Sequence, residues 1–162
     1  MAEWLRRGLQ ILLSQFDSGR GLHILNNYMI DKEILKIASN TESYGFLDNH
    51  SHYSNSKSSI CGDFIKIYLT VKNKKILELK YEGNFCIYCN ASASLLASRI
   101  KNKSVKDTIN FIKLSGGFFK DKKNINNNRD WSSFKKIMNK SNASRKACLL
   151  LPLKTLLKAL NN

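Results

Sequence analysis

Residues 65–81 read IKIYLTVKNKKILELKY, and this stretch decides the fold. Apolar and polar residues alternate on both sides of a Lys72-Asn73-Lys74 turn, with apolar positions at Ile65, Ile67, Leu69, Val71, Leu77, Leu79 and Tyr81. A period of two is typical of a strand that buries one face. The stretch therefore predicts an antiparallel β-hairpin with one face in solvent.

Other elements are predicted on both sides of this hairpin. Before it, Asp31 to Ala38 has the pattern of a short helix, and residues 47–60 are expected to be a loop because Asn, Ser, His and Tyr dominate them. After it, a short extended piece is expected to carry Cys86, and Asn90 is the expected N-cap of a helix whose first turn is made of Ala and Ser.

The C-terminal part of the chain is predicted to be helical with one polar interruption. A first helix is predicted to begin with the capping box Ser104-x-x-Asp107 and to end near Gly116-Gly117. An exposed polar stretch over residues 118–130 and a helix over residues 131–138 are predicted to follow. The last predicted helix covers residues 143–160 and has a kink or break at Pro152.

The charge is strongly basic, with 27 Lys and Arg against 12 Asp and Glu and a net charge of +15. Such a balance is compatible with a nucleic-acid partner. Asn-rich and Lys-rich stretches such as residues 120–128 indicate a compositional bias instead, and no ribonucleoprotein motif, paired zinc finger or basic zipper is visible. We therefore expect no nucleic-acid partner and keep a basic nucleic-acid-binding module as the alternative.

The first 28 residues are interpreted as a leader or extension. Met1 to Gln15 has the apolar spacing of an amphipathic helix with Arg6 and Arg7 on its other side. No run of 18 apolar residues occurs, so no membrane span is expected. We expect a cytoplasmic protein, and the mitochondrial matrix if the leader is a presequence.

Four cysteines carry the functional prediction. Without a secretory signal, they indicate thiol chemistry in a reducing compartment. A metal–thiolate site has two candidate ligand sets, which are the four cysteines or the set Cys61, Asp63, Cys86 and Cys148. Cys86-x-x-Cys89 alone is half of a zinc motif and equally a possible redox pair.

Three motifs make the chain similar to a known family. Cys61-Gly62-Asp63 lies before the first strand of the hairpin, Gly83-Asn84-Phe85-Cys86 leads into the small-residue helix, and Arg145-Lys146-Ala147-Cys148 lies near the C-terminus. With these motifs the chain resembles the scaffold proteins of iron–sulfur cluster assembly, the family of IscU, SufU and the NifU N-terminal domain. The resemblance runs from about Ile30 to Leu160.

The resemblance implies an α+β fold in which a small antiparallel three-stranded sheet packs against helices on one face, as in SufE-like and NifU-like proteins. The scaffold domain would cover residues 29–162, with an insertion at about residues 115–142, and residues 1–28 would be the leader. The insertion, Arg145, and Ala147 in place of the His of IscU place the chain closest to the SufU-like branch. Ser58-Ser59 departs from the usual Asn-Pro before the first motif.

The resemblance also implies the site. Its ligands would be Cys61, Asp63, Cys86 and Cys148, holding Zn(II), Fe(II) or a [2Fe-2S] cluster, while Cys89 would not be a ligand. A scaffold thiolate would attack the persulfide of a SufS-type or IscS-type cysteine desulfurase, with Arg145 stabilising the thiolate. The sulfur would go to recipient apo iron–sulfur proteins. The protein would be a non-enzymatic scaffold or a zinc-dependent sulfurtransferase.

Overall fold

The computed structural model describes residues 31–119 and 129–161. Residues from Lys32 onward belong to one compact unit. The predicted leader helix and the middle of the predicted insertion lie outside the described residues. Within the described part of the chain, no helix is long and apolar enough to cross a membrane.

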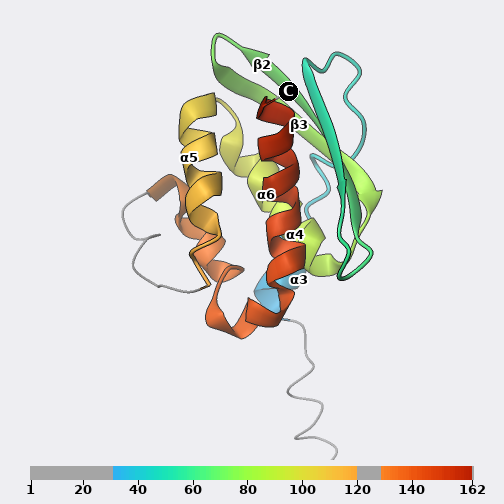
Figure 1. Ribbon diagram of the computed structural model, residues 1–162, viewed down its shortest axis with the longest axis vertical. Helices are drawn as coiled ribbons and strands as arrows, with labels where there is room; N and C mark the ends of the chain where they lie inside the picture. Colours follow the sequence, from blue (N-terminus) through green and yellow to red (C-terminus); the bar gives the residue numbers. More distant parts are fainter. Residues whose placement is uncertain (1–30, 120–128, 162) are drawn as a thin grey trace, which may run out of the picture. The chain divides into compact units, whose positions relative to one another are not determined.

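A three-stranded antiparallel sheet forms one layer of this unit (Figure 1). Its strands are β1 (His52–Lys57), β2 (Phe64–Lys72) and β3 (Lys75–Asn84), in the order β1-β2-β3. Asn73 and Lys74 join β2 to β3 with φ angles of 52° and 59°. Two left-handed residues in a two-residue loop match the twist of the strands they join. The predicted hairpin is therefore confirmed.

Helices form the second layer and cover one face of the sheet (Figure 1). They are α3 (Lys32–Ala38), α4 (Ile87–Ile100), α5 (Val105–Ser115) and α6 (Lys146–Asn161). The sheet buries its alternate apolar residues beneath them, including Ile65, Ile67 and Leu69, all 0% exposed. Removing this apolar surface from water is the main favourable term in folding. The predicted α+β class, with helices on one face, is confirmed.

Small residues bring α4 and α6 close together. Residues 91–97 of α4 are all buried and include three Ala and two Ser. The Ser92 hydroxyl donates to the Leu149 carbonyl at 2.6 Å, which satisfies a buried polar group and ties the two helices together. α6 runs through Pro152, whose ring nitrogen has no hydrogen to donate to the Cys148 carbonyl one turn earlier.

The third strand is β1, which lies in the stretch predicted to be a loop. Its sequence HYSNSK is polar, so the alternation of apolar residues that identifies a strand is missing. Burial nevertheless alternates, because Ser54 is 3% exposed and Tyr53 and Asn55 are exposed. Small serines suit the inward positions of β1, where α6 packs against the strand. The loop prediction for residues 47–60 is wrong at His52–Lys57.

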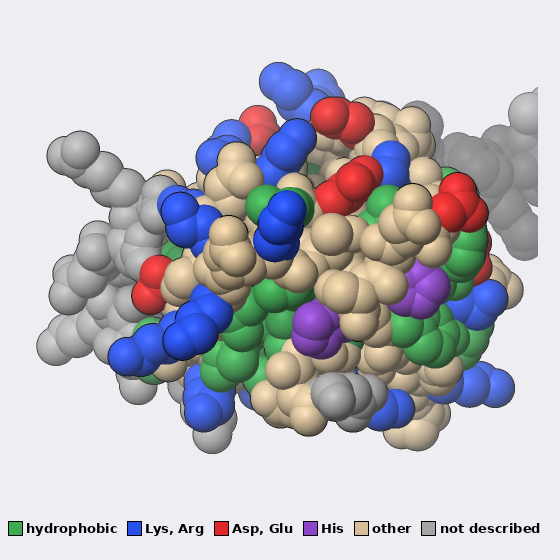
Figure 2. All heavy atoms as spheres, turned by 90° about the horizontal axis from the view of Figure 1, so that it is seen from above, with side chains coloured by type: hydrophobic (Ala, Val, Ile, Leu, Met, Phe, Trp, Pro, Cys, Tyr) green, Lys and Arg blue, Asp and Glu red, His purple; other side chains and the backbone are tan. Residues whose placement is uncertain are grey.

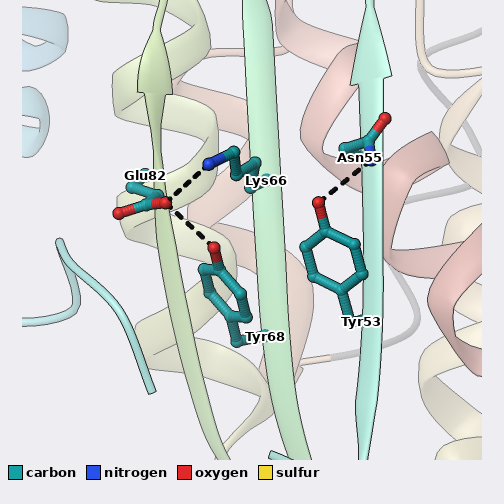
Figure 3. Close-up of polar contacts among 5 residues, drawn as sticks. All are labelled: Tyr53, Asn55, Lys66, Tyr68 and Glu82. Atoms are coloured by element: carbon teal, nitrogen blue, oxygen red, sulfur yellow. Dashed lines mark hydrogen bonds and ion pairs between the residues drawn. The ribbon is translucent and has the colours of Figure 1, made fainter. Parts of the chain in front are cut away.

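Aromatic side chains cover part of the outer face of the sheet. Tyr68 is only 5% exposed, and the rings of Phe46, His50 and Tyr53 contact its ring. The Tyr68 hydroxyl donates to Glu82 at 2.9 Å, and Lys66 pairs with the same carboxylate at 3.1 Å (Figure 3). Burial and the bond to Glu82 raise the pKa of Tyr68 to about 12. The outer face of the hairpin is therefore packed around Tyr68, whereas Lys72 and Glu78 are exposed, so the predicted solvent face is only partly covered.

The start of α4 differs from the prediction in one way. The helix begins at Ile87, and Cys86, its N-cap, has the extended backbone conformation that was predicted for it. Asn90 lies inside the helix and is not its cap. The Asn90 amide donates to the Ala38 carbonyl and accepts a hydrogen bond from the Tyr81 hydroxyl, each at 3.0 Å. Asn90 therefore joins α3, α4 and β3, a tertiary role that outweighs its preference for a cap.

The C-terminal elements follow the prediction in part. The Asp107 N–H donates to the Ser104 hydroxyl at 3.0 Å, which confirms the capping box. The predicted helix over residues 131–138 is instead a 3₁₀ helix, η2 (Arg129–Lys136), and a second one, η3 (Lys140–Arg145), leads directly into α6. Trp131 stacks on Phe111 of α5 at 3.8 Å between ring centroids, which anchors η2 to the core.

Gly83 provides a test of the hairpin. It pairs with Ile65 at a φ of +151°, and a Cβ atom there would clash with the Phe64 carbonyl oxygen. Gly83→Ala should lower the free energy of unfolding by about 2 to 4 kcal/mol, because both the backbone angle and the strand spacing must change. Urea denaturation measures the loss. Gly116→Ala, at a position with a φ of −60° and no atom near the added methyl, is the control and should be nearly neutral. Equal stability of the two variants would contradict the register.

Candidate metal centre

The open end of the hairpin holds two of the predicted site residues together. Phe64, the first residue of β2, pairs with Asn84, the last residue of β3. The segment before β2 and the segment after β3 therefore lie side by side. Asp63 lies directly before β2, and Cys86 lies two residues after β3. The Cys86 N–H donates to Asp63 Oδ1 at 3.0 Å. This bond satisfies one free N–H at the N-terminus of α4 with a carboxylate, which the helix dipole favours there.

Ser58 organises the loop that carries Cys61. Its hydroxyl accepts from the N–H groups of Ile60 at 3.3 Å and Cys61 at 3.4 Å. Its backbone donates to the Asp63 carbonyl at 2.7 Å and accepts from Gly62 at 3.2 Å. Gly62 has a φ of +71°, which only glycine adopts without strain. The loop is therefore a closed turn that presents Cys61 beside Asp63.

The first turn of α6 brings in a third residue, Cys148. One ligand atom each from Cys61, Asp63 and Cys148 lie within 4.8 Å of one another. Asp63 and Cys148 are 5% and 4% exposed, whereas Cys61 is exposed. Residues far apart in the sequence thus meet at one partly open place.

Cys86 completes the group by its contacts. Its half-buried thiol interacts with the Asp63 carboxylate and with the Cys148 thiol. The thiol of Cys148 in turn interacts with those of Cys61 and Cys86. The predicted set of three Cys and one Asp is brought together by three loops or helix ends. We call these four residues the thiol cluster.

Ionisation of the thiol cluster is unfavourable without a counter-charge. Burial raises the pKa of Cys148, and its contacts with Cys61 and Cys86 raise it further. Burial also raises the pKa of Cys86, an effect that the Cys89 N–H opposes and Asp63 reinforces. Like charges disfavour one another at such distances, and burial of Cys148 and Asp63 adds to the cost, so three thiolates and a carboxylate would not all be charged together. A bound cation would remove this penalty, and its binding would release thiol protons.

The donor set fits a soft metal ion. Asp63 Oδ2 is buried and has no hydrogen-bond partner among the described residues, although buried carboxylate oxygens are normally satisfied. Thiolates prefer zinc, copper(I) and iron–sulfur clusters, and a carboxylate is an accepted fourth ligand of zinc. The unsatisfied oxygen beside three thiols is what a four-coordinate site requires.

Cys89 lies next to the thiol cluster but is a separate case. Its side chain is 0% exposed, and burial strongly raises its pKa. The group of ligand atoms that lie within 4.8 Å of one another contains Cys61, Asp63 and Cys148, and neither Cys86 nor Cys89. Cys86 differs from Cys89 because its thiol makes side-chain contacts with Asp63 and Cys148.

Arg145 is the last residue of η3, directly before α6. It is exposed, three residues before Cys148, and its guanidinium lies 5.4 Å from the centre of the Tyr88 ring. Tyr88 belongs to the first turn of α4, two residues after Cys86. A cation–π contact of this kind holds a charged group in place at low entropic cost. Tyr88 has no sequence signal as a site residue, and the predictions missed it.

The fold and the thiol cluster define a class of protein, an α+β domain with three thiols and one carboxylate at the open end of its hairpin. The chain matches the NifU-like N-terminal domain family over residues 29–116. It is 32% identical over 136 residues to the iron–sulfur cluster assembly scaffold protein IscU of Thermotoga maritima, an alignment covering 82% of this chain and 92% of that protein. The chain belongs to this family of iron–sulfur cluster assembly scaffolds.

Solved structures show the same fold. A SUF-system iron–sulfur cluster assembly scaffold protein from Fervidobacterium islandicum has a TM-score of 0.69 and 23% identity, over 81% of this chain and 96% of that one. The N-terminal part of a NifU-like protein from Brucella abortus has a TM-score of 0.70 and 20% identity, over 81% and 91%. The family predicted from the three motifs is therefore confirmed.

The raised thiol pKa values predict how the stability of the metal-free protein depends on pH. Cys86, Cys89 and Cys148 all have a pKa above the ordinary 9.0, so the folded chain keeps protons that the unfolded chain loses. Their stabilisation is complete below this value and is lost as the pH rises past it. Urea denaturation with chelator and reductant should show falling stability between about pH 8 and pH 9.5. Cys148→Ala should flatten this dependence. A stability that rises with pH over this range would contradict the assignment.

Proposed function

We propose that this protein is a scaffold on which iron–sulfur clusters are assembled with sulfur from a cysteine desulfurase. Cys61, Asp63, Cys86 and Cys148 would hold iron, a [2Fe-2S] cluster or zinc. The observation that carries the proposal is the convergence of Cys61, Cys148 and the unsatisfied Asp63 carboxylate within 4.8 Å, with Cys86 in contact. The T. maritima relative, described as a cluster assembly scaffold, supports it.

Cys61 is the best candidate for the sulfur acceptor. It is exposed, whereas Cys86 is half-buried and Cys148 and Cys89 are buried. Its thiolate would attack the terminal sulfur of the desulfurase persulfide, forming a new S–S bond, and the desulfurase cysteine would leave as a thiolate. Ile60 beside it is 81% exposed, so an apolar side chain accompanies the acceptor at the surface. The protein itself would be a carrier and not an enzyme, unless bound zinc makes it a sulfurtransferase.

Arg145 would favour the charged states of the acceptor. A neighbouring cation lowers the free energy of a thiolate, and only the thiolate is nucleophilic. The guanidinium lies 5.4 Å from the centre of the Tyr88 ring, and Tyr88 is two residues after Cys86. Asp63 would act differently, as the hard ligand in a soft set. A carboxylate holds soft metals less tightly than a thiolate does, so its corner of the site would open when the cluster is handed over.

The partners follow from this chemistry. They would be a SufS-type or IscS-type desulfurase and the apo proteins that receive clusters, in the cytoplasm. Figure 2 shows Lys and Arg side chains spread over one face with acidic side chains among them. On the face drawn, the basic side chains do not form the continuous basic patch or stripe that is typical of a nucleic-acid-binding module, which is the alternative together with a structural zinc site.

The ligand set is tested by metal binding. Purified protein should hold about one Zn(II) per chain, and Cys61→Ala, Cys86→Ala, Cys148→Ala and Asp63→Ala should each lower the affinity at least tenfold because four ligands are needed. Cys89→Ala is the matched control and should keep full binding. Chelator competition measures the affinity. Loss of zinc in Cys89→Ala with Asp63→Ala unchanged would instead support a structural site of four cysteines.

Sulfur transfer tests the function itself. Anaerobic incubation with a cysteine desulfurase, cysteine and Fe(II) should give a chromophore in the visible region, with iron and sulfide found by elemental analysis. Arg145→Gln should slow persulfide transfer about fivefold to tenfold, because it removes the cation proposed to stabilise the acceptor thiolate. Lys146→Gln, which removes a neighbouring cation placed 5.8 Å from the Phe119 ring, is the control and should transfer at the normal rate. A protein that gains neither sulfur nor cluster would refute the proposal.

A further inference from the structure

The proposed function uses Cys86 but leaves Cys89 without a role, and the motif Cys86-x-x-Cys89 lies at the N-terminus of α4. Cys86 is the N-cap of α4, with φ −72° and ψ 165°, and Cys89 is the third residue of the helix. A cysteine pair with this spacing at a helix N-terminus is an arrangement that favours reversible disulfides. The position of the pair at the N-terminus of a helix therefore favours a redox role more strongly than the Cys-x-x-Cys spacing alone does.

Joining the two sulfurs requires the start of α4 to move. Side chains three residues apart on a helix have Cβ atoms about 5 to 6 Å apart, and a disulfide needs about 3.5 to 4.5 Å, so the Cβ atoms must approach by about 1 to 2 Å. The Cys89 N–H interacts with the Cys86 thiol, which places this thiol over the first turn of α4. The Asp63 cap bonds the Cys86 backbone N–H and not its thiol, so a disulfide leaves this bond in place.

The two thiols differ in how accessible they are to a reagent in solution. Cys86 is half-buried and interacts with Asp63 and Cys148, so a small reagent entering the thiol cluster meets it. Cys89 is 0% exposed and sits behind it. Cys89 is therefore protected from reagents in solution but is available to a modified Cys86.

We propose that Cys89 is a resolving thiol, which closes a disulfide with Cys86 when a hydroperoxide oxidises Cys86 in the metal-free protein. The pairing makes Cys86 a reversible oxidation site. A bound ion would hold the Cys86 sulfur and prevent the reaction. Only this last effect, and the loss of metal binding described next, depend on the proposed ligand set.

The chemical steps balance. The Cys86 sulfur attacks one oxygen of the hydroperoxide, the O–O bond breaks, and a sulfenic acid and an alcohol (or water) are formed. The Cys89 sulfur then attacks the Cys86 sulfur, and the S–S bond forms. The sulfenic hydroxyl group leaves and takes the Cys89 proton as water. Two thiols are oxidised by two electrons, and the peroxide is reduced.

The disulfide removes Cys86 from the thiol cluster. Cys61, Asp63 and Cys148 would remain, one donor short of the four that a soft ion requires. Oxidised protein should therefore fail to load, and a dithiol reductant should restore it. Two competing disulfides are the alternatives and would contradict the role of Cys89. One joins Cys86 to Cys148, whose thiols interact, and the other joins Cys61 to Cys148, whose sulfurs lie within 4.8 Å.

The test uses the full-length, reduced, metal-free protein and hydrogen peroxide. After treatment, remaining thiols are alkylated, and the residue pairing is read by mass spectrometry. We expect a loss of two hydrogens within one tryptic peptide that contains both Cys86 and Cys89, with Cys61 and Cys148 alkylated. Zn(II) affinity should fall at least about tenfold and recover with dithiothreitol. Protein loaded with Zn(II) beforehand should resist the reaction.

Two variants keep the test decisive. Cys89→Ala should give no disulfide, and its Cys86 should proceed to the sulfinic acid. Cys61→Ser, which alters an exposed residue, should still form the Cys86–Cys89 bond. A Cys86–Cys148 or Cys61–Cys148 disulfide in the wild type, or sulfinic acid at Cys86 with Cys89 present, would overturn the proposal. If the disulfide forms while Zn(II) affinity is unchanged, the resolving role stands and Cys86 is not a ligand, which separates this inference from the proposed function.

Discussion

The hydrogen bond from the Cys86 N–H to Asp63 Oδ1, at 3.0 Å, is the interaction on which the site depends. It joins the chain entering β2 to the first turn of α4, and the pairing of Phe64 with Asn84 holds the two ends in register. One carboxylate oxygen is thereby fixed as a helix cap, and the other is left buried without a partner. The hairpin thus positions the Asp63 carboxylate next to the three thiols.

Charge determines what this arrangement can do. A buried cluster of three thiols and one carboxylate is stable when the thiols are protonated or when a cation compensates them. Proton release and metal binding are therefore coupled here, and burial of Cys148 makes that coupling strong. Exposure of Cys61 gives the same site an entry point for sulfur. A single place can in this way both accept sulfur and hold metal.

Much of this could be predicted from the sequence, for reasons that differ by element. The hairpin was predictable because its apolar residues alternate, whereas β1 was not, because small serines occupy its inward positions. Asn90 misled the prediction of the helix start because its side chain bonds to Ala38 and Tyr81. The sequence separation of Cys61 and Cys148 does not by itself predict that they meet. This contact was predicted only from the family resemblance. The turn built by Ser58 depends on tertiary hydrogen bonds and was missed.

X-ray absorption spectroscopy of the zinc-loaded protein tests the central claim most directly, because it counts the sulfur and oxygen neighbours of the ion. The account predicts three sulfur atoms at about 2.3 Å and one oxygen at about 2.0 to 2.2 Å, with the oxygen lost in Asp63→Ala. Four sulfur atoms in the wild type, unchanged in Asp63→Ala, would contradict it.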